Sequence, residues 1–416
     1  MNTFYWQMTK LAALNIVQSL FSFYFWVVII IVVFLYKREQ TFENHVLGYN
    51  RRTLSYKVVE STLAGIVGGF IASLVILYTG IVIDIDSFMY LWYIALILAL
   101  INPRYLCFSY AGGIISVVYL ITGYPKTDVS GLMIIVAILH LIESILIAID
   151  GYKGSIPVII NHKNGVSGAY LIERFWPIPM MMIALATVLN GSITSVDISQ
   201  PNWWPLFKQA NIDRNAMLLL TPVVAALGYG DIAVNNTPEI VSKKTSIELA
   251  LFSITLFALS ALSYKYYIFK WIAALFAPIA HETIIIIQQK LQRNGKSIFL
   301  PSHQGVKVLY VVENEIGEKL GIKPGDTILS INGATIYNEN VLKDFFNEKR
   351  SYIWLTIIDK NGNKKELNYQ DYKGIEKLGI LIVTNDSNVN YILESEGYFV
   401  FLKNIMLSLK SLFSKR

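Results

Sequence analysis

The stretch GVKVLYVVENEIGEKLGIKPGDTILSINGATI (Gly305–Ile336) decides the fold of the C-terminal part of this chain. It opens with an alternating apolar run, Gly305–Val312, which is typical of a β-strand. Proline presets a turn within Lys323–Gly325, and Asn332-Gly333 is a dipeptide favoured in tight turns between strands. The sequence therefore predicts a small unit of strands and short helices.

The flanking sequence extends this pattern in both directions, from about residue 297 to residue 386. Glu315–Leu320 is predicted to form a short helix and Asp326–Ile331 a strand. Asn338–Arg350 has helical spacing, and Ile353–Ile358 is a further predicted strand. About 90 residues suffice for one small soluble domain.

These residues resemble a bacterial PDZ domain of the circularly permuted type, in which the peptide-binding strand comes early. The resemblance implies structural roles in turns for Gly321, Pro324, Gly325, Asp326, Asn332 and Gly333. It also implies a groove in which a partner segment adds as an extra strand through main-chain hydrogen bonds. The predicted groove residues are Gln304, Gly305, Val306, Lys307, Val308 and Leu309 on the loop and strand, and Val341, Leu342 and Phe345 on the helix.

Two details of this assignment are weaker. The loop Ser302–Gly305 matches by position the loop that receives a terminal carboxylate. It lacks the usual apolar, glycine-rich sequence of that loop. Lys307 is interpreted as a solvated strand residue, with attraction to an acidic partner as the alternative.

The part before residue 293 has the composition of a membrane protein. Of the whole chain, 54% is hydrophobic and only 15% is charged, with a mean hydropathy of +0.48. A helix of about 20 apolar residues crosses a bilayer. The candidate spans are Leu11–Tyr36, Val58–Ile83, Phe88–Ile101, Tyr105–Thr122, Leu132–Ile149, Phe175–Leu189, Met217–Val234, Ile247–Ser263 and Tyr267–Ile287. The third is short and, with the fourth, is also compatible with a hairpin that does not cross fully.

The predicted fold is thus an α-helical multi-pass membrane bundle of six to nine spans (residues 1–292), followed by a small mixed α/β PDZ-like domain (297–386). A basic amphipathic helix (390–416) ends the chain, suited either to an anionic membrane surface or to packing on the protein. The net charge of +6 is modest, and we do not infer binding to nucleic acid.

Basic residues in short loops usually mark the cytoplasmic side of a membrane protein. The loop after the first apolar run holds five of them: Lys37, Arg38, Arg51, Arg52 and Lys57. Alternation from this loop places the PDZ-like domain in the cytoplasm. The placement depends on Tyr267–Ile287, because the domain lies outside if this segment does not cross.

The order of parts and the chain length resemble the MinJ family, topological determinants of cell division in Gram-positive, spore-forming bacteria. The junction FAPIAHETIIIIQQKLQRNGKSIFLPSHQGVKVLYV (Phe276–Val311) and the passage GYGDIAVNNTPEIVSKK (Gly228–Lys244) carry the resemblance. It implies a non-enzymatic adaptor between a DivIVA-like scaffold and a MinD-like ATPase, among other division proteins, at septa and poles. It assigns no residue to either contact, and the oligomeric state stays open, with a homo-oligomer included.

Enzymatic alternatives find weaker support. A site-2 metalloprotease needs His-Glu-x-x-His, whereas His281-Glu282 is followed by Ile285, and Asp150-Gly151 precedes this pair instead of following it. His140 and Glu143 share a helix face and suit a metal or a proton relay, but a polar contact between helices is the favoured interpretation. A solute transporter is a further alternative, although its proline breaks do not pair into matching halves. The sequence thus predicts no catalytic residue, metal or cofactor.

Overall fold

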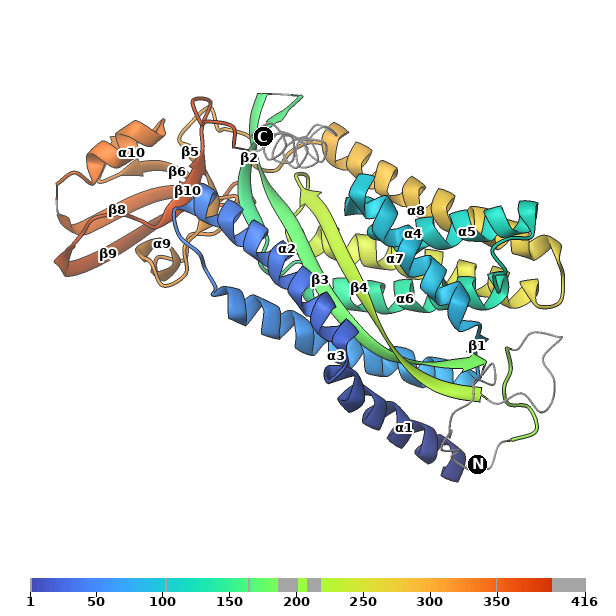
Figure 1. Ribbon diagram of the computed structural model, residues 1–416. Helices are drawn as coiled ribbons and strands as arrows, with labels where there is room; N and C mark the ends of the chain where they lie inside the picture. The colour runs from blue at the N-terminus through green and yellow to red at the C-terminus, as the bar shows by residue number, and fades with distance from the viewer. Residues whose placement is uncertain are drawn as a thin grey trace, which may run out of the picture.

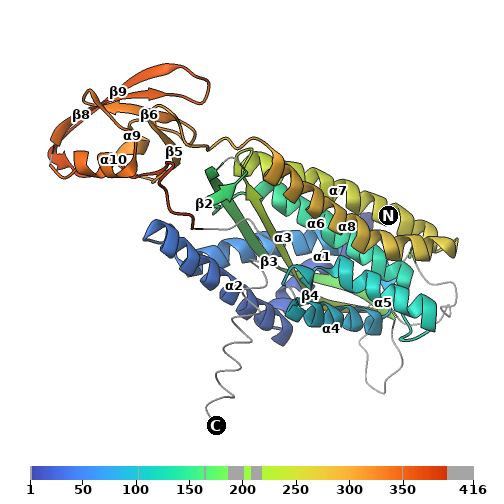
Figure 2. The same cartoon turned by 90° about the horizontal axis from the view of Figure 1, so that it is seen from above.

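The computed structural model describes residues 2–101, 103–163, 165–185, 201–207, 218–348 and 350–390. Helices flank a long two-stranded ribbon, and a second sheet lies at one end of this bundle (Figure 1, Figure 2). The predicted C-terminal helix 390–416 falls, from residue 391 on, outside the described residues.

Four long apolar helices form the frame of the bundle. They are α3 (Leu54–Thr79), α6 (Val129–Asp150), α7 (Pro238–Ser263) and α8 (Ile268–Asn294). By length and composition each is able to cross a membrane, and a bent pair of N-terminal helices raises the number of candidate spans to five. These helices match four of the predicted spans, and the chain has the character of a membrane protein. The predicted number of six to nine spans is not confirmed.

The first predicted span, Leu11–Tyr36, is not one continuous helix. It is divided between α1 (Asn2–Leu20) and α2 (Phe23–Leu47), which meet at an angle of 66°. The hydroxyl of Ser22 accepts a hydrogen bond from the Phe25 N–H at 3.2 Å, so a new helix begins here. Hydropathy alone does not reveal the break, because the residues on both sides are apolar.

Two other predicted spans, Phe175–Leu189 and Met217–Val234, were wrong as helices. The described residues of these segments lie in β3 (Gly165–Leu185) and β4 (Leu218–Ala233), which pair antiparallel from Tyr170↔Ala233 to Leu185↔Leu218. The shorter strands β2 (Ile156–His162) and β1 (Val82–Ile83) join β3, antiparallel and parallel respectively. A short apolar run does not distinguish a buried strand from a helix.

Pro177 and Pro179 explain the choice of a strand. A proline inside a helix removes a hydrogen bond and clashes with the preceding turn. In β3 the two prolines are two residues apart, so they face the same way along the strand edge beside α3. A proline has no N–H, so neither position leaves an unpaired donor at that edge.

The face of α3 that meets this edge is a stripe of small residues spaced four apart: Ser61, Gly65, Gly69 and Ser73. A Cβ added at Gly65 or Gly69 would lie within 3 Å of the carbonyl carbon of Pro177 or Pro179. At the two ends of the stripe, Ser61 donates a hydrogen bond to the Phe175 carbonyl, and Ser73 accepts one from the Met181 N–H at 2.9 Å. The helix thus replaces a missing strand partner for β3.

The short helices α4 (Ile85–Ile101) and α5 (Phe108–Thr122), joined by a 3₁₀ turn η1 (Pro103–Leu106), form a hairpin. Near its start, the Ser87 hydroxyl accepts a hydrogen bond from the Asp128 N–H at 3.0 Å, where α6 begins. At its tip, Cys107 contacts His140, halfway along α6. After α5 the chain reaches Asp128 again in six residues. The hairpin therefore enters and leaves at the same end of the bundle, the alternative that the short apolar runs had left open.

The second sheet, here called the C-terminal sheet unit (residues 306–383), has its own apolar core. Its strands are β5 (Val306–Val311), β6 (Thr327–Ile331), β7 (Ala334–Thr335), β8 (Arg350–Ile358), β9 (Lys364–Ile375) and β10 (Ile380–Val383). They follow the order β10-β5-β6-β8-β9, with β7 beside β6. The helices are α9 (Ile316–Lys319) and α10 (Glu339–Phe345), close to the two predicted short helices.

Candidate functional site

The strand predicted to receive a partner segment, Val306–Leu309, lies inside the sheet. β5 pairs with β6 through Val306 and Lys307, and with β10 through residues Lys307 to Val311. A strand with neighbours on both sides has no free backbone groups for a third. The prediction of a groove along Val306–Leu309 was therefore wrong, because strand pairing depends on residues far apart in the chain and cannot be inferred from the local sequence.

The free edge on this side of the sheet belongs to β10. It follows the loop Glu376–Gly379, and no strand pairs with its outer side among the residues that the structure describes. The carbonyls of Leu378 and Gly379 accept hydrogen bonds from the N–H groups of Gly317 and Val312, at 2.7 and 2.8 Å. The N–H groups of Leu378 and Gly379 have no acceptor within the described part of the chain. A loop with unpaired N–H groups before an edge strand suits a carboxylate.

The helix side of the predicted site is closer to its expected place. α10 begins at Asn338, whose side chain accepts a hydrogen bond from the Val341 N–H at 2.8 Å. Leu342 is buried in the core of the C-terminal sheet unit, whereas Val341 and Phe345 stay partly exposed. Ile380 of β10 is also partly exposed and packs on the same core. The edge strand and the helix thus both present apolar side chains beside unpaired backbone groups.

The remaining predicted residues are structural or point elsewhere. Lys307 donates to the Gly325 carbonyl at 3.1 Å, and burial lowers the pKa of its ammonium group, although Asp326 opposes this shift. Gly305 has a φ of +85°, and a Cβ there would lie 2.9 Å from the Ile328 carbonyl carbon. Lys307 therefore bonds to the turn at Gly325, and Gly305 permits the close approach of β5 to β6, so both residues have roles within the sheet.

The predicted turn residues adopt turns. Gly321, Gly325, Asn332 and Gly333 all have positive φ angles, which suit glycine and asparagine. The Asp326 carboxylate accepts a hydrogen bond from the Lys323 N–H at 2.8 Å and closes the turn that contains Pro324.

Sequence reasoning missed the loop before β10, although a signal was present. Leu378-Gly379-Ile380 is an apolar, glycine-containing sequence at the start of a strand. Ser302–Gly305 lacks this pattern. Gly379 has a φ of +68°, and a Cβ at this position would overlap Glu315. Only glycine fits easily there.

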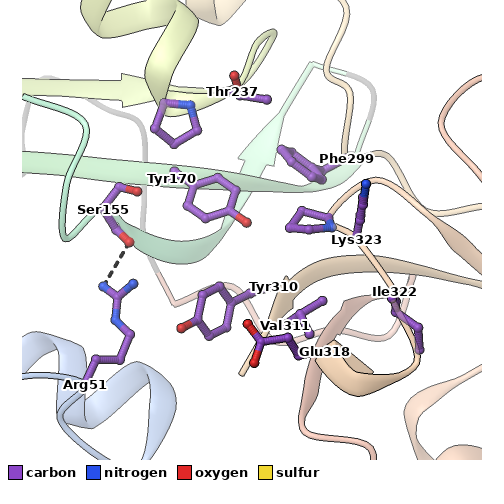
Figure 3. Close-up of a pocket in the computed structure, with 13 residues that line it drawn as sticks. Arg51, Ser155, Tyr170, Thr237, Phe299, Tyr310, Val311, Glu318, Ile322 and Lys323 are labelled. Carbon is purple, nitrogen blue, oxygen red and sulfur yellow. Dashed lines mark hydrogen bonds between the residues drawn. The ribbon is translucent and has the colours of Figure 1, made fainter. Parts of the chain in front are cut away.

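The C-terminal sheet unit packs against the base of the ribbon. Gly168 of β3 donates its N–H to the Phe299 carbonyl at 3.0 Å, and the Tyr170 hydroxyl donates to the Leu309 carbonyl. A cavity of about 490 Å³ remains at this junction, with Tyr170, Phe299 and Tyr310 on its walls (Figure 3). Arg51 lies over the Tyr310 ring at 5.5 Å and donates to the Ser155 carbonyl at 2.9 Å.

The same end of the bundle carries a network of buried charges, here called the charged end. Asp150 accepts hydrogen bonds from Arg174 and, at 2.9 Å, from the Trp176 indole. Lys57 donates to Glu39 at 3.1 Å and to Glu43 at 2.8 Å. Each buried charge has an opposite partner, as burial requires. Helices α2, α3 and α6 have an end here, and Arg174 and Trp176 lie midway along β3, so the network joins these four elements.

Two pairs that the sequence singled out, His140/Glu143 and His281-Glu282, come together between α6 and α8. Cys107, at the tip of the α4–α5 hairpin, lies between the two histidines. The sequence analysis did not connect Cys107 with them, because the three residues lie far apart along the chain.

Comparison with known proteins adds one relative. No protein-family model matches the chain. Over 233 residues it is 24% identical to the cell division topological determinant MinJ of Bacillus subtilis (strain 168). The chain resembles MinJ. The matched region covers 55% of each protein, so the chain spans about half the length of this curated relative. The comparison supports the MinJ-like resemblance stated from the sequence, and it points to cell division.

Proposed function

We propose that this chain is a membrane-embedded, non-enzymatic adaptor of cell division, whose C-terminal sheet unit is a PDZ-like domain that binds partner proteins. The observation that carries the proposal is the free edge of β10, preceded by the unpaired N–H groups of Leu378 and Gly379, together with Val341 and Phe345 of α10, which pack on the same core as Ile380 of β10. The C-terminus of a partner adds along β10, and its carboxylate accepts hydrogen bonds from those N–H groups. Val341 and Phe345 form the apolar wall for its side chains.

The multi-pass bundle fixes this domain at the membrane, on the cytoplasmic side. Four of the five basic residues of the loop after the first apolar run make contacts at the charged end: Arg38, Arg51, Arg52 and Lys57. Lys153 and Arg174 lie there as well. The C-terminal sheet unit packs at the same end, so the positive-inside rule supports a cytoplasmic domain. The resemblance to MinJ makes a DivIVA-like scaffold and a MinD-like ATPase the partners to test first, at septa and poles.

The test compares Val341→Asp with Asn340→Asp on the full chain. Both changes add a carboxylate to α10, but Val341 lines the proposed groove and Asn340 is exposed. In dividing cells we expect the Val341→Asp variant to insert in the membrane and to lose recruitment of the partners, and Asn340→Asp to behave as the wild type.

Extending the C-terminus of the partner by a few residues should weaken binding in a pull-down with the purified chain, because the carboxylate no longer reaches the loop. Normal recruitment by Val341→Asp, at wild-type abundance, would refute the groove. A diffuse membrane signal of the wild-type chain in dividing cells would refute the role in cell division.

A further inference from the structure

Three side chains with metal-binding atoms meet in the interior of the bundle. Cys107 precedes α5 at the tip of the hairpin, His140 lies in α6, and His281 lies in α8. The Cys107 sulfur is 3.0 Å from Nε2 of His140 and 3.6 Å from Nε2 of His281. One atom from each residue lies within 4.8 Å of the other two. Cysteine sulfur and histidine nitrogen are the ligands that zinc prefers.

Hydrogen bonding fixes which nitrogen of His140 faces the sulfur. Nδ1 lies 2.7 Å from the Val136 carbonyl, which only accepts hydrogen bonds. Nδ1 therefore carries the proton, and in the neutral ring Nε2 presents its lone pair to Cys107. A ring N–H bonded to a carbonyl is the usual support of a histidine that binds a metal.

His281 has a similar support through Tyr110. The Tyr110 hydroxyl lies 2.5 Å from a carboxylate oxygen of Glu282 and 3.4 Å from Nδ1 of His281. The hydroxyl donates its proton to the carboxylate and accepts from Nδ1–H. Nε2 of this neutral ring also presents a lone pair to Cys107.

With these hydrogen bonds in place, the cluster has fewer donor protons than nitrogen lone pairs that face them. One thiol has a single proton for two facing nitrogen lone pairs. The Ser109 hydroxyl also lies 2.9 Å from Nε2 of His140, so two polar groups compete for one lone pair. A metal ion in place of the thiol proton bonds the sulfur and both nitrogens together.

We propose that Cys107, His140 and His281 bind one Zn²⁺ ion, with the carboxylate of Glu143 as the fourth ligand. With Zn–S of about 2.3 Å and Zn–N of about 2.0 Å, tetrahedral geometry separates sulfur and nitrogen by about 3.5 Å. The distance to His281 fits this value, and the distance to His140 requires a shift of about 0.5 Å.

Charge balance supports the fourth ligand. Glu143 is buried and lies 3.9 Å from Nε2 of His140. The ion carries two positive charges, and a thiolate and a carboxylate carry one negative charge each, so the site is neutral. Neutrality matters because an unbalanced charge in an apolar interior is costly. On binding, the thiol loses its proton to solvent, so affinity falls as pH falls.

The role of this site is structural. The ion ties the tip of the α4–α5 hairpin to α6 and α8, which are separate in sequence. No step of the proposed adaptor function requires the ion, so the two proposals stand independently.

The test measures metal content in the full chain, purified in detergent from cells supplied with zinc. We expect about one zinc per chain in the wild type, and background values in Cys107→Ser and His281→Gln. His303→Gln is the matched control, because His303 is exposed in the chain before β5 and should keep the metal. Size-exclusion chromatography verifies that the variants are folded.

Cobalt binding gives a second measurement on the wild-type chain itself, after removal of zinc with a chelator. Added Co²⁺ should produce a sulfur-to-metal charge-transfer band and protect Cys107, the single cysteine of the chain, from alkylation. Tyr110→Phe should weaken the affinity by about tenfold without abolishing binding. Wild-type protein without zinc, without the cobalt band and with an unprotected thiol would show a hydrogen-bonded cluster only and overturn the proposal.

Discussion

The close packing of α3 on β3 makes a strong prediction for Gly69→Ala. In an ordinary helix, replacing glycine by alanine stabilises by about 1 kcal/mol. Here the added Cβ would lie 2.8 Å from the Pro179 carbonyl carbon, whereas non-bonded carbons rest at about 3.5–4.0 Å. The helix and the strand must separate by about 1 Å, and backbone on both sides leaves no side chain that can move instead.

The magnitude follows from the contacts that this separation loses. Overpacking of this kind costs about 1–3 kcal/mol. The hydrogen bond from the Met181 N–H to Ser73 lies one turn farther along the helix, and leaving this buried donor unpaired costs about 1–3 kcal/mol more. After the gain in helix propensity, we expect Gly69→Ala to destabilise by about 1–5 kcal/mol.

Two neighbouring positions serve as controls. A Cβ at Gly68 meets the Cγ2 methyl of Ile142 at 2.9 Å, a side-chain contact instead of the backbone contacts at Gly69, so Gly68→Ala should cost less. Val67 is 59% exposed, and Val67→Leu adds one carbon with little effect. Thermal unfolding in detergent, followed by circular dichroism, measures the series. Gly69→Ala at least as stable as Gly68→Ala would refute this account of the interface.

Two further predictions concern charged residues. Asp150→Asn should destabilise by about 3–5 kcal/mol in the same unfolding assay, because Arg174 keeps a buried charge that has lost its main partner; a cost below 1 kcal/mol would show that Glu60, 3.5 Å from Arg174, replaces it. Lys307→Met should leave partner binding unchanged and remove the cost of burying an ammonium group, whose pKa burial lowers. The gain in stability should be full at neutral pH and fade as the pH rises through the lowered pKa of Lys307. A loss of partner binding in Lys307→Met would show that Lys307 contacts the bound partner.

The sequence could predict the local elements of the C-terminal sheet unit. The turn at Lys323–Gly325 and the short helix that became α10 depend on neighbouring residues, since proline, glycine and capping side chains act within a few positions. The same holds for the long apolar helices, whose length and composition separate them from the rest of the chain. The break at Ser22 was missed, because apolar residues continue on both sides of it.

The candidate site was predicted only in part. Val341 and Phe345 stay predicted groove residues, since the structure places them on a short helix and leaves both partly exposed. The strand of the groove was misplaced, because which edge of a sheet stays free depends on the pairing of β5 with β10, about 70 residues away. Cys107 was overlooked for the same kind of reason, since its partners come from two other helices.

Sequence alone therefore determined what some short segments prefer: the long apolar helices α3, α6, α7 and α8 before residue 293, and strands and tight turns after it. The tertiary structure decided which of these segments meet. It placed β3 against the small-residue stripe of α3, left the edge of β10 free and gathered Cys107, His140 and His281 around one point. The physical reason is that propensity acts over one or two turns of chain, whereas packing and strand pairing act between residues that only folding brings together.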